Sequence, residues 1–108
     1  MDRWEEDDDG RALVAERFGR NLRRARRRAG LSQEELAALA SVHRTGIGLW
    51  EHGRRVAGID SLVRLSGSLS VAPEELLDGI LWVPGGGSNG SFAFDGPVPG
   101  RRRVRRDA

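Results

Sequence analysis

The sequence predicts an all-α domain of five short helices, flanked by disordered N- and C-terminal tails. Apolar residues in the middle of the chain recur every three or four positions, and no convincing strand pattern interrupts them. Glycine, proline and helix-capping residues divide this middle part into short segments. The chain of 108 residues has room for one domain with tails. We therefore predict an acidic disordered head (residues 1–11), a helical domain (12–83), and a Gly/Pro-rich linker with a basic tail (84–108).

The first predicted helix begins near Ala12 and ends before Gly30. Its apolar side chains are spaced by three or four residues, so that they share one face: Val14, Phe18, Leu22, Ala25 and Ala29. We expect Gly30 to end this helix in the left-handed conformation, which glycine adopts without strain.

A capping box predicts the start of the second helix, because Glu35 follows Ser32 by three residues. In such a box the hydroxyl and the carboxylate each accept a hydrogen bond from a free backbone N–H group. The expected apolar face of this short helix consists of Leu36, Ala37, Leu39 and Ala40.

The third and fourth helices are predicted from similar signals. After a break near residues 41–42, the third helix spans residues 44–52, and its periodicity places Ile47 and Trp50 inward. Asp60 or Ser61 then caps the fourth helix. The inner face of the fourth helix is expected to hold Leu62, Val63, Leu65 and Leu69.

Pro73 suits the first position of a fifth helix, with Glu74 and Glu75 in the first turn, where the helix dipole favours acids. The apolar residues expected on this helix are Leu76, Leu77, Ile80 and Leu81. Trp82 and Val83 come next, and they serve either as a dimer contact or as a cap on the core.

Composition excludes several classes of function. The chain has no cysteine, so it forms no disulfide and offers no thiolate for metal binding or catalysis. No apolar run is long enough to span a membrane, and the N-terminus lacks the features of a signal peptide. No phosphate-binding loop or catalytic triad pattern is present, and His43 and His52 lack partners for a metal site. We expect a cytoplasmic, nucleoid-associated protein that is not an enzyme and needs no cofactor.

The net charge of +2 conceals a strong separation of charge. Residues 1–10 hold six acids and one arginine, whereas residues 17–55 hold ten arginines and three acids, a net charge of +7. A basic surface of this kind is typical of phosphate contact, although it can also be a solvated helix face. The arginines of the C-terminal tail form either a solvated run or an arm that binds DNA or a protein partner. They are Arg101–Arg103, Arg105 and Arg106. The acids Asp7–Asp9 form a solubility tail or a screen for the basic face.

Two short helices joined by a tight turn predict a helix-turn-helix. Ala37 is small enough to let the two helices approach, and Val42 fills the angle of the turn. The segment GRNLRRARRRAGLSQEELAALASVHRTGIGLWEHGRR resembles the Cro and phage-repressor type of helix-turn-helix, often called the XRE family. The continuation IDSLVRLSGSLSVAPEELL is similar to the family's fourth and fifth helices, so the likeness covers residues 17–81.

This resemblance implies that the third helix enters the major groove of DNA. The positions that then read base edges are Arg44, Thr45, Gly48 and Leu49. The positions implied to contact phosphates are Gln33, His43, His52, Arg54, Arg55 and Arg23. Arg26 and Glu51 match a pair that the family buries as an ion bridge between the first and third helices, so we assign them to stability.

Some positions depart from the family pattern. Ser41 stands at a turn position that is usually glycine, so it must adopt or avoid a left-handed conformation. Gly46 and Gly48 weaken the third helix, and His43 is a poor replacement for a Ser or Thr cap. The reading helix is therefore expected to be loose until DNA holds it.

The function predicted from these observations is a sequence-specific transcriptional regulator, first of all a repressor, that binds double-stranded DNA as a homodimer. The alternative is a protein-interaction module or antitoxin-like protein, in which the two glycines mark a degenerate reading helix. RNA binding is disfavoured, because the major groove of A-form RNA is too narrow for a helix.

Overall fold

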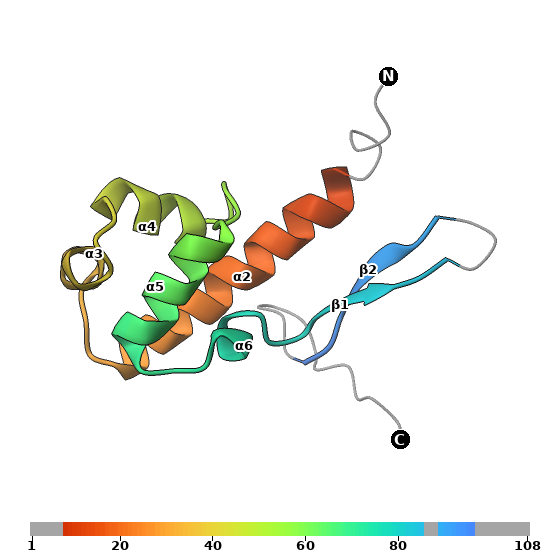
Figure 1. Ribbon diagram of the computed structural model, residues 1–108. Coiled ribbons are helices and arrows are strands. Elements are labelled where there is room, and N and C mark those ends of the chain that lie inside the picture. Colours follow the sequence, from red (N-terminus) through yellow and green to blue (C-terminus); the bar gives the residue numbers. More distant parts are fainter. Residues whose placement is uncertain (1–7, 86–88, 97–108) are drawn as a thin grey trace.

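The computed structural model describes residues 8–85 and 89–96 of the chain. In chain order its elements are α2 (Asp8–Arg28), α3 (Gln33–Ala40), α4 (Arg44–Glu51), α5 (Ile59–Leu69), α6 (Pro73–Leu76), β1 (Ile80–Val83) and β2 (Ser91–Phe94). The long helix α2 runs through the molecule, with α3, α4 and α5 gathered at one end and the hairpin β1–β2 at the other (Figure 1). The prediction of an all-α domain is therefore confirmed only in part: the domain is mostly helical, but it also contains a small two-stranded sheet.

The structure confirms the local signals at two helix boundaries and contradicts one. The fourth helix begins at Ile59 with Gly58 as its N-cap, so neither Asp60 nor Ser61 caps it, and Asp60 lies in the first turn, where the helix dipole favours an acid. Ser32 caps α3, and its hydroxyl accepts a hydrogen bond from the Glu35 N–H while the Glu35 carboxylate accepts one from the Ser32 N–H. These bonds from Ser32 hold the pKa of Glu35 below its usual value. Gly30 has a φ of 73°, the left-handed value expected after α2.

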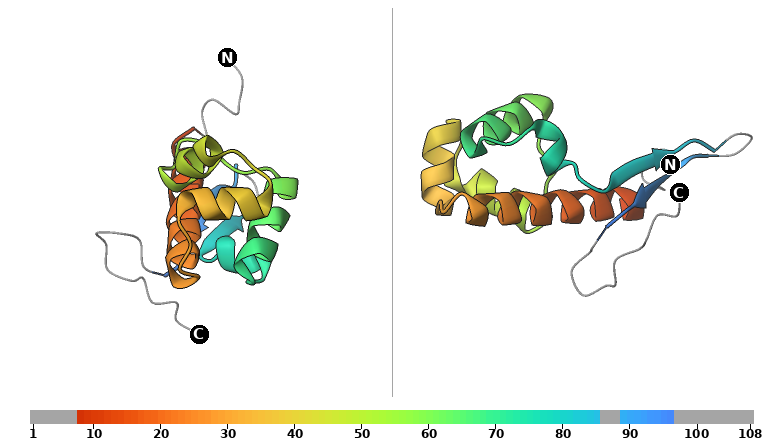
Figure 2. Two further views of the ribbon diagram at one scale, coloured as in Figure 1. Left: turned by 90° about the vertical axis from the view of Figure 1, so that its left-hand side faces the viewer. Right: turned by 90° about the horizontal axis from the view of Figure 1, so that it is seen from below.

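One hydrophobic core joins all the helices. Its buried side chains come from α2, α3, α4, α5 and α6, namely Phe18, Leu22, Leu36, Ala37, Ala40, Ile47, Trp50, Leu65, Leu69 and Leu76. Seen along the end of the molecule, α2, α3, α4 and α5 surround a common centre (Figure 2). The core thereby fixes α4 against both α2 and α3.

Four apolar residues expected on helix faces lie elsewhere than predicted, and a fifth, Leu81, is exposed on the strand β1. Leu39 and Val63, expected in the core, are 60% and 55% exposed. Leu77 and Ala29 are also exposed. Each of these four residues lies at the margin of an apolar stripe, where helical spacing alone does not distinguish a buried face from the edge of an exposed one.

The predicted fifth helix is wrong beyond its first turn. The helix α6 ends at Leu76, and Ile80 begins the strand β1 instead of continuing the helix. The Asn21 side chain donates hydrogen bonds to the backbone oxygens of Leu76 and Asp78, which satisfies carbonyls at the helix end. Gly79, with a φ of 80°, then turns the chain into the strand.

The predicted linker also contains structure, because Ser91–Phe94 pairs antiparallel with Ile80–Val83. Trp82 packs edge-on against Phe92 with ring centroids 5.0 Å apart. The hairpin is fixed to α2 by Arg17, which is 3% exposed and donates to the Asp95 carbonyl. Burial lowers the pKa of Arg17 below its ordinary value.

The predicted disordered head is shorter than expected, since α2 begins at Asp8. The sequence gives no sign that the hairpin would lie beside this end of α2, where a Cβ on Gly10 would be 3.2 Å from the Phe92 ring. The first turn of α2 is therefore packed against the hairpin at Gly10, a contact of the kind that stabilises short helical segments in proteins. The rest of the head, and the arginines of the tail (101–106), lie outside the described residues.

Two serines occupy the left-handed conformation. Ser41 ends α3 and Ser70 ends α5, each with a φ of 57°. Such a conformation costs a residue with a Cβ about 1–2 kcal/mol, whereas glycine adopts it freely. Of the two options that the sequence left for Ser41, the structure therefore has the strained one.

We expect Ser70→Gly to raise the free energy of unfolding by about 1 kcal/mol, because it relieves this strain at an exposed position. The matched control is Ser68→Gly, two residues earlier inside α5, which should lower the free energy of unfolding by about 0.5–1 kcal/mol. Urea unfolding followed by circular dichroism measures both changes. Two variants that change stability in the same direction would contradict the prediction.

Candidate nucleic-acid interface

The helix α4 has one buried face and one solvent face. Ile47 and Trp50 are buried against the core. On the other side Arg44 and Thr45 are exposed at the first turn, and Gly48 and Leu49 are partly exposed. All four predicted base-reading positions are therefore accessible to a ligand, and an arginine lies at the start of the helix.

The predicted pair of Arg26 and Glu51 forms a bidentate ion pair. The Glu51 carboxylate is fully buried, with Arg26 Nε 2.6 Å from one oxygen and Arg26 Nη2 3.0 Å from the other. Arg26 also donates to the Leu31 carbonyl. The hydrogen bonds with Glu51 raise the pKa of Arg26 above its ordinary value. This pair holds the end of α4 against α2.

Gln33 belongs to the same network. Its side-chain amide donates a hydrogen bond of 3.1 Å to Glu51, so that α2, α3 and α4 meet at one carboxylate. Gln33 is only half-buried and keeps a second amide N–H for a ligand. Arg23 lies on the same side, with its Nε 3.8 Å from Glu51 and its side chain 42% exposed. The Glu51 carboxylate therefore helps to orient the side chains of both Gln33 and Arg23.

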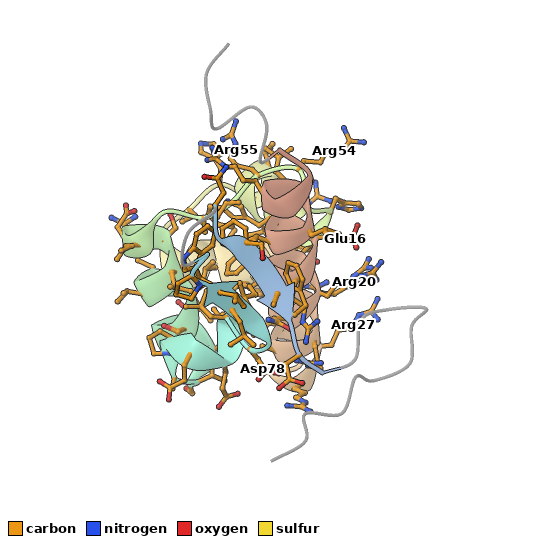
Figure 3. All side chains as sticks on the ribbon, turned by 90° about the vertical axis from the view of Figure 1, so that its right-hand side faces the viewer. Glu16, Arg20, Arg27, Arg54, Arg55 and Asp78 are labelled. Carbon is orange, nitrogen blue, oxygen red and sulfur yellow. The ribbon has the colours of Figure 1, made fainter. Side chains whose placement is uncertain are left out.

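Further arginines extend the basic surface beyond α4. Arg54 and Arg55 follow the helix and are exposed. Figure 3 shows Arg54, Arg20 and Arg27 projecting outward along one edge of the molecule, with Glu16 among them. The surface beside α4 is consequently rich in donors that suit phosphate oxygens.

The two histidines occupy the two ends of α4. His43 is the N-cap residue, and its side chain makes no capping hydrogen bond, as the sequence predicted. His52 follows the last turn, and its Nδ1 lies 2.8 Å from the Gly48 carbonyl oxygen. Both rings are exposed. Within residues 8–85 and 89–96, no group of three His, Asp or Glu side chains is arranged to hold a metal ion.

Gly19 is a structural determinant of this surface that sequence reasoning missed. A Cβ at this position would lie 2.3 Å from the Trp50 carbonyl oxygen and 2.8 Å from that of Glu51. The end of α4 therefore rests directly on the backbone of α2. The only signal in the sequence is a glycine inside an otherwise regular helical pattern.

Comparisons with known proteins agree with this geometry. The control protein C.BamHI of Bacillus amyloliquefaciens is 39% identical over 62 residues, which are 56% of this chain and 76% of that protein. The crystal structure of the restriction-modification controller protein C.AhdI from Aeromonas hydrophila is 37% identical and has a TM-score of 0.56. That similarity covers 57% of this chain and 94% of the controller. The clp gene regulator ClgR from Corynebacterium glutamicum is 25% identical, with a TM-score of 0.57 over 59% of this chain and 68% of ClgR.

The helix-turn-helix family model HTH_3 matches residues 22–76, which include α3, α4, α5, α6 and the end of α2. The hairpin and the first part of α2 lie outside this match. No helix in the described part of the chain combines the length and the apolar character needed to cross a membrane. The chain belongs to the HTH_3 helix-turn-helix family.

Proposed function

We propose that this protein regulates transcription by placing α4 in the major groove of double-stranded DNA, as a homodimer on two half-sites. Its family makes it a DNA-binding transcriptional regulator. The observation that carries the proposed binding mode is the exposed first turn of α4, a helix whose other end is held against α2 by the buried ion pair of Arg26 and Glu51. Half-sites about one helical turn apart would suit such a dimer.

The proposed binding mode has two kinds of contact with DNA, one to base edges and one to phosphates. Arg44, Thr45, Gly48 and Leu49 read base edges, and the Arg44 guanidinium is suited to O6 and N7 of guanine. Phosphates are contacted by Gln33, His43, His52, Arg54, Arg55 and Arg23. Phosphate contacts supply affinity and fix the register, whereas base contacts choose the sequence.

The likeness to two control proteins suggests a setting for this activity. C.BamHI and C.AhdI are 39% and 37% identical to the chain, and the second is named a restriction-modification controller. We therefore propose that the operator lies upstream of the protein's own gene or of neighbouring restriction-modification genes. The protein would act in the cytoplasm at the nucleoid, as a repressor or an activator.

The test is fluorescence anisotropy with a labelled duplex of the upstream region and a scrambled duplex, between about 50 and 200 mM salt. A regulator should prefer the upstream duplex by about a thousandfold or more, with a steep loss of affinity as salt increases. Equal affinity for both duplexes would contradict sequence-specific binding. Absence of binding at low salt would favour a protein-interaction module instead.

Arg44→Ala should reduce the discrimination between two DNA duplexes, the selected site and the same site with the contacted guanine replaced. The expected reduction is about 5- to 150-fold, equivalent to about 1–3 kcal/mol. The melting temperature should remain that of wild type, because Arg44 is exposed. Arg28→Ala is a matched control, since Arg28 is exposed and lines a hollow beside α6. Unchanged discrimination in Arg44→Ala would remove this residue from the base-reading set.

Gly48→Ala should separate stability from DNA binding. Nothing lies within 4 Å of a Cβ at this position, so alanine fits and should stabilise α4 by up to about 1 kcal/mol. In the proposed complex the same methyl group points toward the base edges and should weaken binding by about tenfold or more. A variant with a higher melting temperature and unchanged affinity would mean that DNA does not approach Gly48.

A further inference from the structure

His52 is held in one orientation at the end of α4 by bonds to the helix itself. Its backbone N–H donates to the Gly48 carbonyl oxygen at 3.0 Å, and its ring Nδ1 lies 2.8 Å from the same oxygen. The next residue, Gly53, has a φ of 72° and lies against α2, where a Cβ would be 3.0 Å from the Glu16 Cα. The exposed ring of His52 therefore extends from a backbone that is fixed on both sides.

The contact with Gly48 determines which ring nitrogen carries the proton. A carbonyl oxygen only accepts hydrogen bonds, so Nδ1 of His52 must be the donor in this contact. A neutral imidazole has a single N–H group. When His52 is neutral, its other nitrogen, Nε2, therefore carries a lone pair and no hydrogen. The protonated ring carries a hydrogen on both nitrogens and keeps its bond to Gly48.

This arrangement decides how His52 can meet a phosphate. Since Gly48 occupies Nδ1, the nitrogen that remains for a ligand is Nε2. A phosphate oxygen is negative and accepts hydrogen bonds, so the lone pair of a neutral ring repels it. The imidazolium ion instead offers it an N–H group and a positive charge, which together form a charge-assisted hydrogen bond. A neutral ring can donate to a phosphate only after it gives up its bond to Gly48.

We propose that His52 contacts a DNA phosphate through Nε2 as an imidazolium ion, so that DNA binding takes up a proton at each half-site. The inference rests on the proposed function, in which His52 is a phosphate-contacting residue, and it adds a dependence on pH. Imidazole is the side chain that ordinarily changes charge between about pH 5 and pH 8. Because the complex holds the proton more firmly than the free protein does, affinity for DNA decreases as the pH increases through this range.

The charged side chains on the elements around His52 keep their charge in the same range. Carboxylates ordinarily lose their proton below about pH 5, and arginine stays protonated to above about pH 12. These side chains come from α2, α3, the end of α4 and the segment that follows it, namely Glu16, Arg20, Arg23, Arg26, Glu34, Glu35, Glu51, Arg54 and Arg55. Figure 3 shows Glu16, Arg20 and Arg54 on one edge of the molecule.

The other histidine of the chain, His43, provides an internal comparison. It lies at the opposite end of α4 as the N-cap residue, and its side chain makes no capping hydrogen bond. Either nitrogen of its neutral ring can therefore carry the proton and donate to a phosphate. Contact of His43 with DNA consequently does not require the charged form, as contact of His52 does.

The first experiment measures affinity for the labelled upstream duplex by fluorescence anisotropy at two pH values and one ionic strength. Wild type should bind about tenfold more weakly, or weaker still, at about pH 8 than at about pH 6, the ratio expected between a charge-assisted and a neutral hydrogen bond. His43→Gln is the matched control at the other end of α4, and it should keep this dependence. Equal wild-type affinity at both pH values, or loss of the dependence in His43→Gln, would overturn the proposal.

Two substitutions of His52 separate the two ring nitrogens. The amide nitrogen of glutamine reaches the position of Nε2 and donates at every pH, so His52→Gln should bind equally well at both pH values. The amide nitrogen of asparagine takes the position of Nδ1 and leaves no donor at Nε2. His52→Asn should therefore bind at both pH values as weakly as wild type does at the higher one. If His52→Asn binds as tightly as His52→Gln, or if His52→Gln keeps the pH dependence, the proposal fails.

The proton on Nδ1 is tested without DNA, by nuclear magnetic resonance of the ring nitrogens at high pH. The signals of His52 are those missing from His52→Gln, and they should show hydrogen on Nδ1 and none on Nε2. Hydrogen on Nε2 would overturn the inference.

The binding experiment also distinguishes this inference from the proposed function. Binding of the upstream duplex that is specific but independent of pH would overturn the inference and leave the proposed function intact. Equal binding of the upstream and scrambled duplexes, with a pH dependence that His52→Gln removes, would contradict the specific regulator and support the inference. Absence of DNA binding at both pH values would overturn both.

Discussion

Replacing Glu51 with alanine should lower the free energy of unfolding by about 3–5 kcal/mol, the typical cost of removing one partner from a buried ion pair. The Glu51 carboxylate is fully buried and accepts hydrogen bonds from both Arg26 and Gln33. Its loss leaves the Arg26 guanidinium without a counter-charge, with only the bond to the Leu31 carbonyl remaining. Since domains of this size have about 5–15 kcal/mol of stability, the variant should be close to unfolded at ordinary temperatures.

Two comparisons separate the buried charge from the loss of side-chain volume. Glu16→Ala removes an exposed carboxylate from α2 and should remain within about 0.5 kcal/mol of wild type. Adding Arg26→Met to Glu51→Ala removes the orphaned charge, so the double variant should lose less stability than the sum of the two single variants. Urea unfolding of the four proteins measures the coupling. Additive losses would show that the pair contributes only through packing.

The features that sequence reasoning predicted well depend on local chemistry. The capping box of Ser32 and Glu35 and the left-handed Gly30 require only neighbours in the chain, and both are present. The pairing of Arg26 with Glu51 spans 25 residues, and it was implied by the family resemblance rather than by any local pattern. Family knowledge therefore supplied the long-range contact that periodicity alone could not.

The hairpin shows where local signals fail. Ile80–Val83 continues an apolar run after a short helix, and an apolar run of this length is compatible with helix or strand. The choice is made by Ser91–Phe94, which lies beyond a glycine-rich segment, and by the contact of Arg17 with the Asp95 carbonyl. None of these partners is adjacent in sequence. The exposure of Leu39 and Val63 was missed for a similar reason. Whether an apolar side chain is buried depends on which other elements of the fold pack against it, and helical spacing does not contain that information.

Gly19→Ala should destabilise the domain, although alanine is the better helix former. The expected loss is the one typical of an overpacked core, about 1–3 kcal/mol or more. The added methyl group would lie 2.3 Å from the Trp50 carbonyl oxygen, and that atom belongs to the backbone of α4 rather than to a flexible side chain. The two helices must therefore separate. Their separation disturbs Trp50 in the core and the ion pair of Glu51 at the same time.

Gly46→Ala is the matched control, because it makes the same change within α4 itself. A Cβ at Gly46 meets the Trp50 ring at 3.7 Å, an ordinary contact, so this variant should gain up to about 1 kcal/mol of stability. If Gly19→Ala lowers the melting temperature and Gly46→Ala raises it, then residue 19 must be glycine because α2 packs closely on α4, and not because of helix propensity. At temperatures where Gly19→Ala remains folded, its DNA affinity should still fall, since α4 is displaced relative to Arg23 and Gln33. Wild-type stability in Gly19→Ala would instead mean that α4 does not rest on α2 at this point.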